Sequence, residues 1–486
     1  MLKDMTDSKR IFFLVTGLLT ISVFVLSQSH LYKMSQDQKL YELSVVWKEL
    51  SYNFANMDNC RGLNPDSLYR AYIPIVQKTK NDFEYYKSLQ QFLAHFHNGH
   101  TRCEMPDYVW DHLALPFLIT TYRDGKLLID NIGSHYSKKI TVDDEILKID
   151  DLPAMEYIRK FGSAYVSSSN KDETLMKYSM FNPDLNTLIT YAPKSYKKKI
   201  RLEVKTPHGI ERVKIPYDME MMPAPRDTAR QATRMFVKKR NSPMPEENIL
   251  LTDSVNSVAY LRFNHCDKEF QSFFQQRYPT IKRYNNLIVD ITGNAGGDGN
   301  AMIDAIFCLI TADSIQWNVN KTRVNNGYYR ARGSVCYYYQ EGKIPQHEKE
   351  LYDPYFFDTA FVNIPFPVYA NPVSPADRYK GNIYVITGSF TASAAESFAV
   401  SLTKNPKTVL IGSKTAGATA QPLVVRLPSG IEVRINTCKN YDYRGRDISS
   451  GITPDYEHNF SGIYKTGQPK DWLKDIYEYI GSLPNQ

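Results

Sequence analysis

The sequence predicts an α/β fold for the C-terminal half of a chain that is α+β overall. Two segments there each read as a strand, a turn of small residues and a helix: NNLIVDITGNAGGDGNAMIDAIFCLI and GNIYVITGSFTASAAESFAVSL. The run KTVLIGSKTAG supplies a third strand. Strands that alternate with helices favour right-handed crossovers and a largely parallel sheet. We expect this core to occupy residues 248–486.

The N-terminus has the pattern of an export signal. Lys9 and Arg10 precede the apolar run IFFLVTGLLTISVFVL, residues 11–26. A basic segment followed by an apolar one is typical of a signal peptide, and an uncleaved signal anchor is the alternative. We therefore assign residues 1–30 to a signal peptide or anchor. The bulk of the protein is expected in the periplasm, in the cell envelope or outside the cell.

The next two regions differ in their periodicity. Residues 38–104 are predicted to form a helical subdomain, because YELSVVWKELSYNF and DFEYYKSLQQFLAHF carry apolar residues at helical spacing. Residues 105–217 contain short β-rich runs such as LPFLITTY and KLLIDNI. The succession of strand and helix in ITVDDEILKIDDLPAMEYIRKF resembles a PDZ domain. This region is therefore expected to be an embedded PDZ-like domain.

Two further segments carry little periodicity. Residues 218–247, rich in Pro, Met, Arg and Lys, are expected to be a linker. Their basic stretch RMFVKKR lacks interleaved aromatic residues, so no nucleic-acid partner is expected despite a net charge of +7. Residues 327–375 are rich in Tyr, Phe and Pro, and they either cover part of a cleft or form a surface insertion.

Ser393 has two compatible interpretations. Ser393 and Glu396 have the spacing of a capping box at a helix start, which requires no further function. A serine at a strand–turn–helix corner is also how several hydrolases present a nucleophile. The cap geometry would aim the hydroxyl, so both roles can hold for one residue.

The turn DITGNAGGDGN, residues 290–300, is the candidate oxyanion site. It lacks the Gly-Lys-Ser/Thr of a phosphate-binding loop and the glycine spacing of a dinucleotide fingerprint. The alternative is simply a tight strand-to-helix turn. If its strand neighbours that of Ser393, both turns meet at the carboxyl ends of the strands. The N–H groups of Ala394 and of Gly296 or Gly297 could then stabilise an oxyanion, by about 3 kcal/mol per donor.

His100 is the candidate base, because it lies in a glycine turn just past a helix. The segment HFHNGH also contains His95 and His97. Those two are two residues apart on a helix and point to different faces, which argues against a shared metal ion. The six cysteines are scattered without a CxxC pair, so a zinc ribbon is not expected and the pairing of disulfides stays open. No metal or organic cofactor is required.

Four motifs resemble those of the tail-specific, or C-terminal processing, serine peptidases, and a fifth resembles one branch of them. NLIVDITGNAGG is similar to their DLRGNxGG strand, and SFTASAAE to their nucleophile segment. IGSKTAGA resembles the following strand and loop, and GITPD their closing GIxPD. NGHTR resembles the DGHT of the branch that includes tricorn protease and the interphotoreceptor retinoid-binding proteins. The resemblance implies a crotonase-like protease core, an embedded PDZ-like domain and an endopeptidase acting on proteins or peptides.

The resemblance also assigns roles to residues. The nucleophile corresponds to Ser393. Ala418 occupies the position of the lysine base of the Ser/Lys branch, so His100 is implied as base, with Lys414 as a weaker alternative. The supporting carboxylate precedes GIxPD, and Asp447 is the nearest acid, one residue from the expected position.

Three other family positions matter. The chain departs from the family pattern at Thr292, usually arginine, and at Asn98, usually aspartate. Asp290 matches the aspartate at the end of the family's strand and is expected to be structural.

Two functions follow from these residues. The favoured one is an exported serine endopeptidase that uses Ser393, His100 and a backbone oxyanion hole, with protein or peptide substrates. The alternative is a catalytically inactive peptide- or ligand-binding protein of the cell envelope that keeps the fold. The membrane is expected to be involved only through a possible N-terminal anchor, and the sequence predicts no oligomeric state.

Overall fold

The computed structural model describes most of the chain after residue 33. The described residues are 34–110, 114–116, 118–123, 125–132, 139–170, 199–220, 238–239, 248–315, 318–324, 329, 333, 345–357, 359–364, 368–419, 422–460 and 469–484. The predicted export signal, residues 1–30, lies outside them. Within these ranges, no helix is both long and apolar enough to cross a membrane.

A six-stranded sheet forms the C-terminal core. Its order is β10-β11-β12-β17-β18-β22, and only the β10–β11 pair is antiparallel. The strands are β10 (Ile249–Asp253), β11 (Val258–Arg262), β12 (Asn286–Asp290), β17 (Asn382–Thr387), β18 (Thr408–Gly412) and β22 (Tyr456–Glu457). The largely parallel sheet predicted from the strand–turn–helix units is therefore confirmed.

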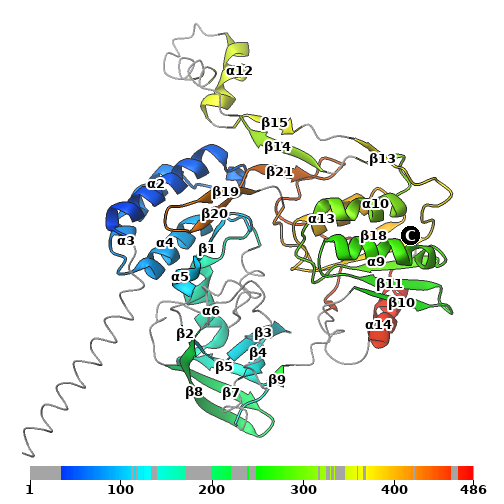
Figure 1. The fold of residues 1–486 in the computed structure, drawn as a ribbon, viewed down its shortest axis with the longest axis horizontal. Helices are drawn as coiled ribbons and strands as arrows, with labels where there is room; N and C mark the ends of the chain where they lie inside the picture. The colour runs from blue at the N-terminus through cyan, green and yellow to red at the C-terminus, as the bar shows by residue number, and fades with distance from the viewer. Residues whose placement is uncertain are drawn as a thin grey trace, which may run out of the picture.

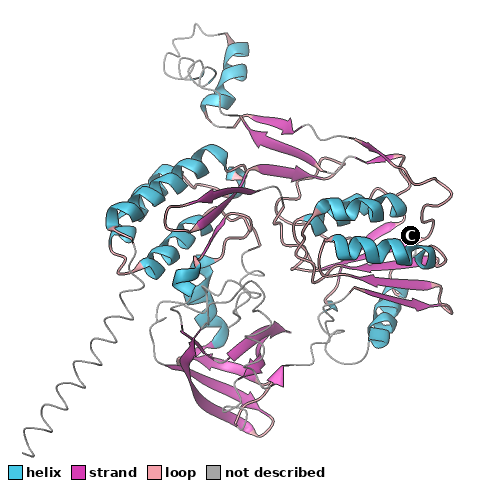
Figure 2. Ribbon diagram, in the orientation of Figure 1, coloured by secondary structure: helices cyan, strands magenta, loops and turns pink. Residues whose placement is uncertain are grey.

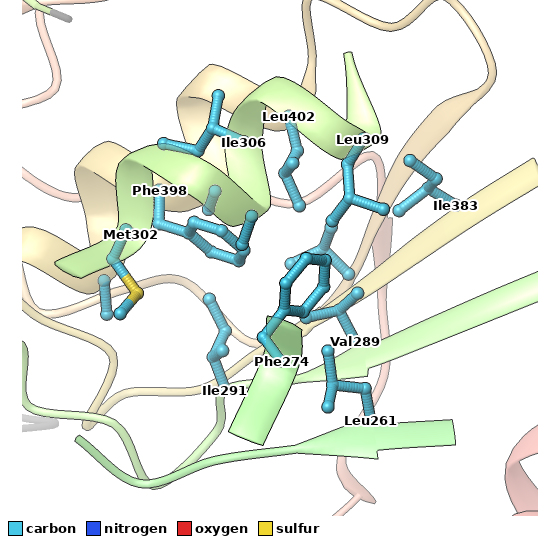
Figure 3. Packing of buried hydrophobic residues seen from close by; sticks show 14 of the residues in the cluster. Leu261, Phe274, Val289, Ile291, Met302, Ile306, Leu309, Ile383, Phe398 and Leu402 are labelled. Carbon is cyan, nitrogen blue, oxygen red and sulfur yellow. The ribbon is translucent and has the colours of Figure 1, made fainter. Parts of the chain in front are cut away.

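Helices cover both faces of this sheet (Figure 1). On one face pack α9 (Lys268–Ile281), α10 (Ile303–Leu309), which follows the short helix η5 (Gly299–Met302), and α13 (Ala394–Leu402). Figure 3 shows Phe398 and Ile306 from the helices facing Val289 and Leu261 from the strands. On the other face, α14 (Pro469–Gly481) buries Trp472 against β11 and β12. Burial on both faces explains why the strands read as continuous apolar runs.

The N-terminal helices share a core with strands from the far end of the chain. They are α2 (Gln36–Asn53), η1 (Met57–Asn59), α3 (Pro65–Gln77) and α4 (Asp82–Ala94), followed by β1 (Arg102–Glu104) and α5 (Asp107–Trp110). β1 pairs with β20 (Glu432–Asn436), which pairs with β19 (Pro422–Arg426). Leu427 and Ile431 from the turn between β19 and β20 are buried among the helices. The helical segment is thereby tied to the C-terminal half.

A second sheet lies in the β-rich region, and Figure 2 draws its strands in magenta at the bottom of the view. The path of this sheet is β2-β8-β7-β5-β4-β3. Its strands are β2 (Ala114–Pro116), β3 (Leu118–Arg123), β4 (Lys126–Ile132), β5 (Glu145–Ile149), β6 (Leu152–Pro153), β7 (Lys199–Thr206) and β8 (Gly209–Glu220). The strand β9 (Lys238–Lys239) pairs with β4. The helix α6 (Ala154–Gly162) packs against β5 and β6, and the short helix η2 (Ser163–Tyr165) follows it. The likeness of this unit to a PDZ domain stays a prediction.

An arm extends from the core between β12 and β17. It contains β13 (Ser314–Ile315), β14 (Val319–Arg323), α12 (Gln346–Phe356), β15 (Phe361–Ile364) and β16 (Tyr369–Ala370), and β14 also pairs with β21 (Cys438–Tyr441). Figure 1 shows α12 beyond the β14–β15 pair, away from the parallel sheet. No residue of α12 is buried. The described part of this segment therefore has the character of a surface insertion.

Candidate functional site

Ser393 lies on a strained corner between β17 and α13. Its φ is 56° and its ψ is −121°, a backbone conformation that costs a residue with a Cβ about 1–3 kcal/mol. The preceding turn is fixed by Thr391, whose hydroxyl donates to the carbonyl of Ile291 (2.8 Å) and accepts from the N–H of Gly388 (3.0 Å). A strained strand-to-helix turn that exposes a serine is the geometry of a nucleophile elbow.

The glycine turn after β12 packs directly against Ser393. The N–H of Ala392 donates to the carbonyl of Asn294 across 3.1 Å. A Cβ added to Gly296 would lie only 2.8 Å from the Cβ of Ser393 and 2.9 Å from the nitrogen of Ala394. No other residue type fits this contact without a shift of the backbone. The structure therefore brings together the two turns whose proximity the sequence predicts.

Hydrogen bonds to Asn294 and Cys266 also fix the glycine turn. The N–H of Gly296 donates to Oδ1 of Asn294 (2.8 Å), and its carbonyl accepts from the N–H of Cys266 (3.1 Å). The carbonyl of Cys266 accepts from the N–H of Asp298 (2.7 Å). The Gly296 N–H is therefore engaged inside the loop, which favours Gly297 over Gly296 as the predicted oxyanion donor.

Asp290 at the end of β12 forms a buried ion pair with Arg262. The distance from Nη1 of Arg262 to Oδ2 of Asp290 is 2.7 Å, and both side chains are at most 1% exposed. The N–H and hydroxyl of Thr292 donate to Oδ1 (3.1 and 2.8 Å), and the hydroxyl of Tyr260 donates to Oδ2 (2.5 Å). These bonds fit the structural role expected for Asp290. Arg262 of β11 also lies beside Thr292. Thr292 is the turn position at which the family usually has arginine.

His100 lies in a tight turn after α4. Oδ1 of Asn98 accepts from the N–H of His100 (2.9 Å), which an aspartate at this position would also do. The hydroxyl of Ser167 lies 2.8 Å from the carbonyl of Asn98 and 2.5 Å from that of Thr101. Oγ1 of Thr101 accepts from the N–H of Asn436 in β20 (3.1 Å). The backbone of this turn is thus fixed on both sides.

A short path of contacts joins the His100 turn to Ser393. A Cβ added to Gly99 would lie 3.0 Å from the Cβ of Ala418, so the loop after β18 touches this turn closely. In the same loop, the N–H of Gly417 donates to Oε1 of Glu396 (2.8 Å). The other oxygen of Glu396 accepts from the N–H of Ser393 (3.0 Å). The predicted nucleophile and base are therefore linked through one carboxylate and one loop.

Asp447 and Lys414 both contact the segment around residues 449–451. Asp447 is exposed, and its Oδ1 accepts from the N–H of Ser449 (2.8 Å) within the same turn. The stem of Lys414 lies against Gly451, where an added Cβ would meet Cε at 3.3 Å. The predicted role of Asp447 as the carboxylate that supports His100 stays a prediction.

The other described histidines and cysteines give no sign of a metal site. The hydroxyl of Tyr72 shares a hydrogen bond with Nε2 of His95 (3.1 Å). In the part of the chain that is described, no group of three or more His, Cys, Asp or Glu side chains is arranged to hold a metal ion. Among the described cysteines, Cys60, Cys103, Cys266 and Cys308 are free thiols. Burial raises the pKa of Cys266, beside the glycine turn, to about 12, so this thiol is protonated and unreactive at neutral pH.

Comparison with known proteins identifies the family of the core. The sequence pattern of peptidase family S41 matches residues 257–458. This match covers less than half of the chain, and it supports a serine-type peptidase, as the resemblance in the sequence implied. No curated protein sequence matches the chain significantly.

The two CPAF structures share the fold over nearly the whole chain. The crystal structure of mature CPAF superposes with a TM-score of 0.61 at 16% identity, covering 92% of this chain and 96% of that one. Mature CPAF complexed with lactacystin also gives 0.61 at 16% identity, covering 92% and 97%. The photosystem II D1 C-terminal processing protease gives 0.41 at 14% identity, covering 86% and 92%. At this identity, the CPAF likeness shows the fold alone, and its 92% coverage of this chain extends well beyond the S41 segment.

Proposed function

We propose that this S41 peptidase is an exported endopeptidase in which Ser393 is the nucleophile and His100 the general base. The observation that carries the proposal is the strained backbone of Ser393, packed against Gly296 at the carboxyl ends of β12 and β17. Backbone strain of this kind persists only where surrounding contacts enforce it, and it gathers at active sites. Protein or peptide substrates follow from the family.

The reaction uses the residues in a defined order. The hydroxyl oxygen of Ser393 attacks the carbonyl carbon of the scissile peptide bond while His100 accepts the hydroxyl proton. The tetrahedral intermediate places its negative charge on the former carbonyl oxygen. His100 then donates its proton to the leaving nitrogen, the C–N bond breaks and an acyl-enzyme remains. Water, activated by the same histidine, hydrolyses the ester and restores Ser393.

The backbone supplies the oxyanion site. We assign the N–H groups of Ala394 and Gly297 to this role, because Ala394 begins α13 directly after the nucleophile and Gly297 belongs to the turn that packs on it. Each such donor contributes about 3 kcal/mol of transition-state stabilisation. Gly296 contributes by allowing the close approach of the two turns. Asp447 is proposed to orient His100 and to stabilise its cation during turnover.

Export is proposed from the N-terminal sequence. Lys9 and Arg10 ahead of the apolar run 11–26 support translocation by a signal peptide or a signal anchor. The peptidase would then act in the periplasm, in the cell envelope or outside the cell. Fractionation of cells expressing the full chain, with a protease-accessibility assay, tests this: a wholly cytoplasmic chain would contradict export.

The catalytic assignment is tested by incubating the purified full chain with casein and following peptide release. Ser393→Ala and His100→Ala should each lower cleavage to background. Cleavage that survives in His100→Ala but not in Ser393→Ala would transfer the role of base to Lys414. A wild-type chain that cleaves neither casein nor a peptide library would contradict the endopeptidase assignment and favour a binding protein with this fold.

A further inference from the structure

The carboxylate of Glu396 collects hydrogen bonds from three separate segments. It is fully buried in the first turn of α13. Oε2 accepts from the N–H of Ser393 (3.0 Å), and Oε1 accepts from the hydroxyl of Thr415 (2.5 Å) and the N–H of Gly417 (2.8 Å). Only the first of these bonds belongs to a helix cap. The others hold the loop after β18 against the nucleophile corner.

Helix capping alone does not account for this arrangement. A capping box needs one acceptor at the third helical position, and glutamine serves there as well as glutamate. Burial of a charged carboxylate costs several kcal/mol unless strong hydrogen bonds compensate. Here both oxygens are used by donors, and hydrogen bonds to an ionised acceptor are about twice as strong as neutral ones. The second oxygen therefore serves the contact between the corner and the loop.

The loop held by Glu396 reaches two other parts of the site. The hydroxyl of Thr415 accepts from the N–H of Ile452 (2.7 Å), which ties in the segment that follows Gly451. Ala418, next to Gly417, contacts the glycine of the His100 turn. A shift of the carboxylate would therefore move the Ser393 corner relative to the loop on which the His100 turn packs.

We propose that Glu396 is a positioning residue for the peptidase reaction. Through Thr415 and Gly417, it fixes the position of the Ser393 corner relative to the His100 turn. The inference rests on the proposed function, because it concerns the alignment of that nucleophile and base. Glu396 contacts neither reacting proton in this scheme. Its effect is geometric, and a misplacement of about 1 Å lowers turnover about 100-fold.

The variant Glu396→Gln tests the proposal with little change of shape. An amide offers one oxygen acceptor, so its NH₂ group must face the N–H of either Ser393 or Gly417. The matched control is Glu42→Gln, because Glu42 is also buried and accepts from three donors, the N–H and hydroxyl of Ser429 and the hydroxyl of Tyr85. Glu42 lies in α2 and holds the β19–β20 turn, remote from the nucleophile corner in the chain.

Two readouts on the full chain separate positioning from folding. The first is kcat and KM on a peptide substrate, and the second is the rate at which a fluorophosphonate probe labels Ser393. We expect Glu396→Gln to lower kcat and the labelling rate 10- to 100-fold with KM within about threefold of wild type, while Glu42→Gln stays within twofold in both. A Glu396→Gln protein that matches wild type in kcat and labelling would overturn the inference.

A second pair of variants keeps the test decisive if Glu396→Gln does not fold. Thr415→Val removes the hydroxyl bridge and should lower kcat, whereas Thr415→Ser retains it and should restore most of the rate. Equal rates for Thr415→Val and wild type would contradict the inference. Failure of the proposed function has a different signature, since Ser393→Ala would then cleave and label as wild type does.

Discussion

Substitution of Gly296 by alanine gives the sharpest structural test of the site. A Cβ at this position would lie 2.7 Å from the carbonyl oxygen of Ala392, 2.8 Å from the Cβ of Ser393 and 2.9 Å from the nitrogen of Ala394. The φ of Gly296 is also positive, at 95°. The added methyl group therefore meets both a steric and a conformational penalty, and the atoms it meets belong to the nucleophile corner.

The expected loss of unfolding free energy in Gly296→Ala follows from these two penalties. A left-handed backbone costs alanine about 1–2 kcal/mol, and overpacking by one methyl group costs about 1–3 kcal/mol. The matched control is Gly62→Ala, since Gly62 has a φ of 78° and nothing within 4 Å of an added Cβ. The control carries only the first penalty. Gly296→Ala should therefore lose about 1–3 kcal/mol more of unfolding free energy than Gly62→Ala.

Urea denaturation and peptidase assays on both variants measure these effects. Any relief of the clash in Gly296→Ala must displace the Ser393 corner, so kcat/KM should fall at least tenfold while Gly62→Ala keeps the wild-type value. The reasoning would be refuted if Gly296→Ala were as stable and as active as Gly62→Ala. That result would mean that the two turns do not pack as the structure describes.

Three further predictions concern strain, contact and charge. Ser393→Gly should be about 1 kcal/mol more stable than Ser393→Ala, because glycine tolerates the positive φ. Both variants should be inactive, and equal stability in urea denaturation would argue against a strained corner. Gly99→Ala should lower kcat/KM by displacing the His100 turn from Ala418, 3.0 Å from the added Cβ, and unchanged kinetics would contradict that contact. Burial lowers the pKa of Lys87 to about 8 from its usual 10.5, so between these values the unfolded chain binds the extra proton and stability rises with pH. Lys87→Met should therefore be up to about 3 kcal/mol more stable than wild type below pH 8, with the advantage shrinking towards pH 10.5, and a pH-independent difference in urea denaturation would refute this.

The parts of the fold that follow from local pattern could be predicted. The units around Asp290 and Ser393 each show an apolar run, small residues and a helical period within about 25 residues. Because β12 and β17 pair in parallel, their following turns must meet at one edge of the sheet. Once the two strands are neighbours, the contact between the Gly296 turn and the Ser393 corner follows from the sequence pattern.

Contacts between distant segments could not be predicted. Leu427 and Ile431 pack among the N-terminal helices, more than 330 residues away in the chain, and no periodicity in either segment indicates its partner. Likewise, the capping box identified Glu396 as an acceptor for Ser393, but its bonds to Thr415 and Gly417 depend on how the loop after β18 returns. Cys308 lies in the apolar run of α10, yet its side chain is only half-buried, which helical spacing alone does not indicate.

Labelling of the full chain with a fluorophosphonate probe, followed by mass spectrometry of the modified peptide, tests the central claim most directly. The account predicts one modified residue, Ser393, with a labelling rate that falls at least 100-fold in His100→Ala because the serine then lacks its base. Modification of another serine, or labelling of Ser393 at an unchanged rate in His100→Ala, would contradict the Ser393–His100 mechanism.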